Sequence, residues 1–138
     1  MSHKTFDSEI LLRVFYRWGA EGQRTSCGAL SRMILELGPA VSLHAEEDVI
    51  LVSASDDMFV VITNMRLIMI TNEVHNQIYL DEVADCSVSI ASFKTPNKSL
   101  WDRCVVTAQD GSEYIVICEP GLPFWGIFNI MNTAAAMN

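Results

Sequence analysis

The densest grouping of side chains that could bind a metal ion is the run His44-Ala-Glu46-Glu47-Asp48. Imidazole and carboxylate groups are ligands of divalent cations. We favour a solvated acidic linker instead, because these ligands lack a rigid spacing. The other two histidines are isolated: His3 lies in a terminus that we expect to be poorly ordered, and His75 lies in an expected turn. We therefore predict no metal site and no cofactor.

The sequence contains no recognisable catalytic centre. A Ser–His–Asp set can be assembled only on paper, since the strand-to-helix motif Gly-x-Ser-x-Gly is absent. The phosphate-binding pattern Gly-x-x-x-x-Gly-Lys is absent as well, and the chain has 7 glycines in all. We predict that the protein is not an enzyme.

Arg66 follows a tight turn at Asn64-Met65. One interpretation is a contact with an anionic ligand. We prefer the other, an ion pair that stabilises the turn, with Asp81 or Glu82 as the expected partner.

The 4 cysteines are far apart and each lies within an apolar pattern, without the Cys-x-x-Cys spacing of a zinc or redox site. This favours buried free thiols in a reducing compartment. The first residues also lack the basic-then-apolar order of a signal peptide, and no apolar run reaches the ~18 residues of a membrane span. We therefore expect a cytoplasmic protein.

The net charge of −8 is unevenly distributed. Residues 1–44 hold five basic and four acidic residues, whereas residues 45–138 hold four basic and thirteen acidic residues, a balance of −9. A surface this acidic repels phosphate polymers and anionic head groups, so we expect no nucleic acid partner.

The first 44 residues have the period of two helices. Asp7 or Ser8 can cap the first, whose apolar face is Ile10, Leu11, Val14, Phe15 and Trp18. The second begins at Thr25 or Ser26, has the apolar face Cys27, Leu30, Met33, Ile34 and Leu37, and ends at Gly38-Pro39. Together they predict a helical hairpin, packed on the rest of the chain or on a partner.

From about Ala45 the period changes to two, and β-branched residues dominate. Seven strands are expected, near 49–54, 58–63, 66–71, 77–80, 85–92, 103–109 and 113–118, with Asp110-Gly111 as a hairpin turn. Pro123 then suits the first turn of a helix that runs from Phe124 to about Met137. The pattern predicts a mainly β, α+β domain: an antiparallel barrel or sandwich closed by a C-terminal helix.

Three stretches of this region resemble the bacterial PH-like domains related to the GRAM and short-C-terminal-domain families. They are Glu47-Asp-Val-Ile-Leu51, the hairpin Phe59-Val-Val-Ile-Thr-Asn-Met-Arg-Leu-Ile-Met69, and Asp110-Gly111 through Glu119-Pro-Gly-Leu-Pro-Phe-Trp-Gly126. The resemblance covers roughly residues 45–138 and implies a seven-stranded PH-like fold. Such domains bind phosphoinositides through a basic first hairpin loop, or bind proteins along a strand edge or groove. Here that loop, Ser53 to Asp57, has no Lys or Arg and carries two carboxylates, which disfavours lipid head groups.

We therefore expect a non-catalytic protein-binding or assembly module that self-associates, because three amphipathic helices and a barrel carry more apolar surface than one small core needs. The candidate interface residues are Trp18, Trp101, Phe124, Trp125 and Phe128, with core packing as the alternative for the tryptophans. The second hypothesis is an acidic antagonist, of the immunity or counter-defence type, that blocks a basic protein. Its candidate contact surface is Asp56, Asp57, Asp81, Glu82 and Asp85. A third, less favoured hypothesis is membrane association through Phe124-Trp125 or the loop Lys94–Lys98.

Overall fold

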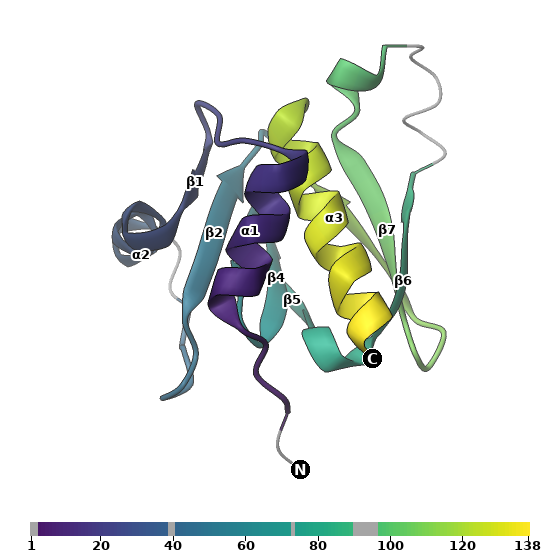
Figure 1. The fold of residues 1–138 in the computed structure, drawn as a ribbon. Helices are drawn as coiled ribbons and strands as arrows, with labels where there is room; N and C mark the ends of the chain where they lie inside the picture. Colours follow the sequence, from purple (N-terminus) through teal and green to yellow (C-terminus); the bar gives the residue numbers. More distant parts are fainter. Residues whose placement is uncertain (1–2, 39–40, 73, 90–96) are drawn as a thin grey trace.

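The computed structural model describes residues 3–38, 41–72, 74–89 and 97–138. In these residues the chain forms two antiparallel sheets and three α-helices (Figure 1). The first sheet has the order β1 (Thr25–Cys27), β2 (Val49–Ala54), β3 (Phe59–Thr63), β4 (Arg66–Thr71) and β5 (Val74–Tyr79). The second has the order β6 (Val83–Val88), β7 (Arg103–Ala108) and β8 (Glu113–Ile117). Short 3-10 helices, η1 (Leu80–Glu82) and η3 (Lys98–Leu100), precede β6 and β7.

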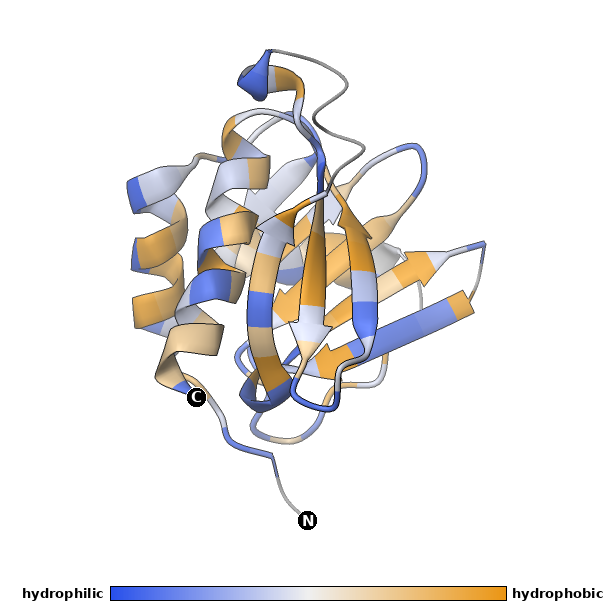
Figure 2. Cartoon of the chain, turned by 90° about the vertical axis from the view of Figure 1, so that its right-hand side faces the viewer, coloured by the Kyte–Doolittle hydropathy of each residue, from blue (hydrophilic) through white to orange (hydrophobic). Residues whose placement is uncertain are grey.

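The strands form where apolar β-branched residues run between turn formers. Nearly every residue of β3 and β4 is buried, whichever face of the sheet its side chain is on. This is expected for central strands of a sheet that is covered on both faces. The β7–β8 turn places Gly111 at φ +91°, and the Asp110 carboxylate accepts a 2.9 Å hydrogen bond from the Ser112 amide. Figure 2 shows hydrophobic residues (orange) along the strands of both sheets and hydrophilic residues (blue) in the turns. The predicted Asp110-Gly111 hairpin is confirmed.

Helices α1 (Ser8–Trp18) and α3 (Leu122–Met137) lie side by side (Figure 1). Helix α1 contacts β2 of the first sheet, and α3 packs mainly on β6 of the second sheet. Both helices share one core with the face of the first sheet that meets the second sheet, here called the inner face. Asp7 caps α1, since its carboxylate accepts hydrogen bonds from the amides of Glu9 and Ile10. The two helices approach closely because Gly126 has no side chain: a Cβ there would lie 2.4 Å from the Phe15 ring. The C-terminus is held as well, as the Asn138 side chain donates to the η1 carbonyl of Leu80 at 2.8 Å.

Helix α2 (Gly28–Leu37) covers the opposite, outer face of the first sheet. There Leu35 packs in a separate apolar cluster with Val52, Val61 and Ile68. The predicted helical hairpin of residues 1–44 is therefore wrong, because α1 packs on α3 whereas α2 packs on β2 and β1. The residues between the helices form β1, which extends the sheet by pairing Thr25 with Ser53.

The coarse fold is confirmed: antiparallel sheets followed by a C-terminal helix, with all seven predicted strands present. Of the two predicted architectures, barrel or sandwich, the sheets form an open sandwich and not a closed barrel. One detail is corrected, because the described residues contain an eighth strand, β1. Among the described residues, no helix is long and apolar enough to span a membrane.

Candidate functional site

The most highly connected polar group in the described residues is a buried ion pair between Glu47 and Arg66. The guanidinium binds the carboxylate through two contacts, Nε to Oε2 at 2.7 Å and an Nη2 to Oε1 contact at 2.9 Å. The Glu47 side chain is completely buried, and that of Arg66 is 10% exposed. Arg66 also donates to Gln77 at 2.6 Å and to the Ser42 carbonyl. The expected partner of Arg66, Asp81 or Glu82, is wrong: the cation pairs with the acid that precedes β2.

The β3–β4 turn, Thr63-Asn64-Met65-Arg66, positions this pair. The Thr63 hydroxyl donates to Glu47 at 2.6 Å and accepts hydrogen bonds from the amides of Met65 and Arg66. The Asn64 side chain accepts from the Asp48 amide at 2.8 Å. The Thr-Asn-x-Arg segment therefore joins the turn to the acidic run before β2.

These contacts change the acidity of Glu47. Burial by itself raises the pKa of the carboxyl group, but hydrogen bonds from Arg66, Thr63 and the His44 amide, with the charge of Arg66, hold that pKa below its usual value. Glu47 is thus ionised at neutral pH, and its oxygens are occupied by protein donors. The run His44 to Asp48 consequently cannot offer this carboxylate to a cation.

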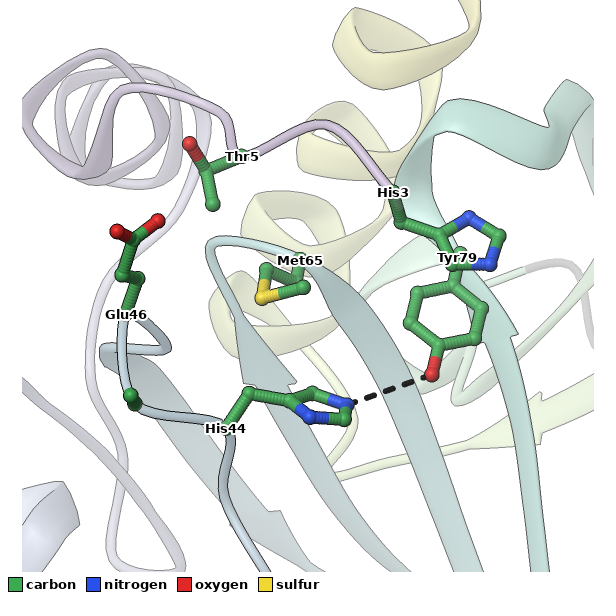
Figure 3. A pocket seen from close by; sticks show the side chains of 7 residues that line it. His3, Thr5, His44, Glu46, Met65 and Tyr79 are labelled. Carbon is green, nitrogen blue, oxygen red and sulfur yellow. Dashed lines mark hydrogen bonds between the residues drawn. The ribbon is translucent and has the colours of Figure 1, made fainter. Parts of the chain in front are cut away.

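A cavity of about 430 Å³ opens beside this network (Figure 3). It is lined by His3, Thr5, His44, Ala45, Glu46, Met65 and Tyr79. His3 is ordered by stacking on Tyr79, with ring centroids 3.6 Å apart and an interplanar angle of 3°. From the other side of the cavity, His44 Nε2 lies 3.4 Å from the Tyr79 hydroxyl (Figure 3). The turn predicted around His75 is wrong, because His75 lies within β5 with an exposed side chain.

One group at the rim of this cavity has the donor types of a cation site. A His3 nitrogen and carboxylate oxygens of Asp81 and Glu82 lie within 4.8 Å of one another. His3 Nδ1 is 3.0 Å from Asp81, which also accepts from the Lys4 amide at 2.9 Å. Burial raises the pKa of Asp81, but these hydrogen bonds from Lys4 and His3 outweigh it and leave the pKa below its usual value. Asp81 is thus held by hydrogen bonds from Lys4 and His3.

Two further cavities lie along β5. One, of about 450 Å³, is lined by Val41, Ser42, Arg66, Ile68, His75, Asn76 and Gln77. The other, of about 310 Å³, is lined by Met58, Met69, Thr71, Asn76, Glu113, Tyr114 and Ile115. All three cavities therefore include residues of the same edge strand.

The structure separates the predicted aromatic interface residues into two groups. Trp18 is 53% exposed at the end of α1, and Trp125 and Phe128 are half-buried. Phe124 is completely buried and Trp101 is only 8% exposed. As surface contacts these last two are wrong, because they pack in the core, where Trp101 meets Trp125 at a centroid distance of 5.8 Å.

The predicted acidic surface is distributed over two places. Asp56 and Asp57 are exposed in the β2–β3 turn, and Asp56 forms a 2.9 Å ion pair with Arg24. Glu82 and Asp85 are exposed in η1 and β6, whereas Asp81 is half-buried and bound to His3. These residues therefore lie on different elements rather than in one continuous motif.

Sequence reasoning missed the solvent-facing side of α2. Leu30 and Met33 were expected in its buried face but are 52% and 58% exposed. The residues that contact the sheet are instead Leu35, with Ile34 beside it, while Ser31 is fully buried.

Comparison of the chain with protein-family models, with curated protein sequences and with solved structures gives no match. Its function must therefore be argued from its own geometry.

Proposed function

We propose that this chain is a non-catalytic, PH-like protein-binding module that self-associates through the outward face of α2. The order of seven strands and a final helix after residue 45 supports the PH-like assignment. The observation that carries self-association is the exposure of Leu30 and Met33 on a helix whose other side is already packed on the sheet.

Leu30 and Met33 lie three residues apart, so their side chains are neighbours on the surface of the helix. Ser31 and Leu35 face the sheet and are buried, which fixes the rotation of α2 and leaves this pair in solvent. Exposed apolar residues that are neighbours on the surface, unlike scattered single ones, are typical of interfaces. Pairs with this spacing are also the anchors by which amphipathic helices dock on partners.

A second copy of the chain fits this face. Two copies of α2 packed antiparallel about a two-fold axis near the middle of the helix bring the exposed Leu30 and Met33 side chains of both copies together. On the charged flank of the exposed face lie Arg32 and Glu36, both exposed. In the antiparallel pair each Arg32 lies near the Glu36 of the other copy, so the surface is complementary to itself. Arg32 is available for this contact, because its present contact with Asp48 is 3.4 Å long and leaves half of the side chain exposed.

Analytical ultracentrifugation across the micromolar range tests this proposal. The exposed apolar surface of Leu30 and Met33 is small, so we expect a weak dimer that forms only as the protein concentration rises. Met33→Asp should abolish the dimer, whereas Leu100→Asp, a matched control on η3 with 56% exposure, should not. Arg32→Glu should weaken the dimer, and Arg32→Glu combined with Glu36→Arg should restore it. A wild-type chain that stays monomeric throughout the range contradicts self-association.

The second candidate function is an acidic module that binds and blocks a basic protein. It is favoured by the interactions of the basic side chains, because every described Lys and Arg forms an ion pair with a carboxylate or lies over an aromatic ring. Carboxylates such as Glu46, Asp85 and Glu113 have no ion-pair partner among the described residues. Titration with a defined basic peptide at low and high salt separates the candidates, because electrostatic docking weakens steeply with salt and an apolar dimer does not.

A further inference from the structure

Strand β5 is an edge of the five-stranded sheet that no other described strand covers. Its first four residues, Val74 to Gln77, are all exposed. An edge strand presents unpaired backbone N–H and C=O groups, which can pair with one more strand. The opposite edge differs, because β1 has only three residues and α2 packs against it.

The two cavities along β5 lie on opposite faces of the sheet. The pairing register sets Asn76 opposite Met69, whose side chain is in the inner core, and Gln77 opposite Ile68, which packs in the outer cluster. The cavity of about 310 Å³ contains Met69 and is therefore on the inner face. The cavity of about 450 Å³ contains Ile68 and is on the outer face. A strand added to β5 sends alternate side chains to these two faces, so it meets a cavity on each.

The charges beside this edge are negative. Glu113 lines the inner cavity, and Glu46 lines the cavity at the Tyr79 end of β5. Neither carboxylate has an ion pair in the described part of the chain. Arg66 lines the outer cavity, but Glu47 neutralises it through two hydrogen bonds. The edge is therefore complementary to a basic segment.

We propose that β5 binds an extended basic segment of a partner protein as an additional strand, with two Lys or Arg side chains three residues apart. Asn76 lines the inner cavity, and Tyr79 lines the separate cavity of about 430 Å³ that includes Glu46. These positions are three residues apart, an odd number, so they face opposite sides of the sheet. A cation opposite Asn76 reaches Glu113, and a cation three residues along reaches Glu46. The residue opposite Gln77 enters the outer cavity beside Arg66, where an uncharged side chain fits.

This inference rests on the proposed protein-binding function but not on the α2 dimer, since α2 and β5 lie at different ends of the first sheet. The probe is a capped, β-prone peptide of Thr and Val with Lys residues at positions i and i+3. One comparison peptide has the same composition with Lys at i and i+2, which puts both on one face, and another has Glu in place of Lys. Binding is followed by calorimetry and by amide chemical shifts.

We expect the i, i+3 peptide to bind more tightly than both comparison peptides and to shift the amides of β5. Glu46→Gln and Glu113→Gln should each weaken binding about three- to five-fold at low salt, the upper range for an exposed charge pair. Glu9→Gln, an exposed acid on α1, is the matched control and should leave binding unchanged.

Equal binding of the Lys and Glu peptides, or shifts confined to another edge, overturns the proposal. It is also overturned if β5 amides shift with protein concentration alone, because a second copy then occupies the edge. Met33→Asp separates the two proposals: it should remove the dimer and leave peptide binding intact. If Met33→Asp loses peptide binding, the β5 site is overturned. If Met33→Asp still forms the dimer, the α2 interface is refuted and the β5 site is not affected.

Discussion

Replacing Glu47 by Gln tests the role of the buried ion pair in holding the β3–β4 turn. The substitution keeps the volume and one acceptor oxygen but leaves Arg66, 10% exposed, without its counter-charge. Removing one partner of a buried ion pair lowers the free energy of unfolding by about 3–5 kcal/mol. The whole free energy of unfolding of a domain is only about 5–15 kcal/mol, so this is a large part of it. For 138 residues, about 1 kcal/mol corresponds to roughly 3 °C in Tm, so we expect a fall of about 10–15 °C.

Urea unfolding at several pH values gives the sharper readout. The folded-state pKa of Glu47 is depressed, so its stabilising contribution is present above the usual carboxyl pKa of about 4.3 and is lost as the pH falls through the lower folded value. The gap in unfolding free energy between wild type and Glu47→Gln should therefore be constant near neutral pH and narrow below about pH 4.

The matched control is Asp56→Asn, which breaks the exposed pair with Arg24. The Asp56 side chain is 93% exposed, and we expect a cost below about 1 kcal/mol. The role of Glu47 in holding the turn is refuted if Glu47→Gln costs no more unfolding free energy than Asp56→Asn at pH 7, or if the deficit of Glu47→Gln is the same at pH 7 and pH 3.

Three further predictions concern the helices and the thiols. Gly126→Ala should destabilise the fold by about 1–3 kcal/mol in urea unfolding, because the new Cβ lies 2.4 Å from the Phe15 ring; an unchanged midpoint would mean that α1 and α3 are less tightly packed. Asp7→Ala should cost about 1 kcal/mol through loss of the α1 cap, while Asp7→Asn should retain most of it; equal losses would argue against capping. Burial raises the pKa of the Cys27 thiol to about 11, so iodoacetamide at pH 8 should label it slowly in the native protein and rapidly in urea. Rapid native labelling would show that β1 opens in solution.

The strands were predictable because the period of two along a strand and the residue types of a turn can both be recognised within a short stretch of sequence. Every strand from residue 49 onward lies within a few residues of its expected place, and Asp7 caps α1 as its position before an apolar helix implies. Strand β1 was missed because Thr25 and Ser26 are also good helix-capping residues, and three residues carry too little alternation to be recognised.

The wrong predictions concern which residues pack against or pair with one another, and not where the predicted helices and strands lie. The helical periodicity of α2 predicts an apolar face, but which side is buried depends on the sheet, and β2 selects Leu35 rather than Leu30 and Met33. Similarly, the turn before Arg66 indicated an ion pair, yet the acid comes from Glu47, 19 residues away, because β2 and β3 pair antiparallel. Phe124 was assigned to a surface that the fold closes, and Trp101 takes the alternative that was left open for it, packing in the core. Long-range pairing determined each of these outcomes.

Sedimentation equilibrium of the wild-type chain beside Met33→Asp measures directly whether the chain self-associates through α2. We expect the wild type to approach twice the 15.4 kDa chain mass as concentration rises, while the variant remains at the mass of one chain and keeps the wild-type circular dichroism spectrum. A monomeric wild type, or a dimer that Met33→Asp leaves intact, would contradict self-association through α2.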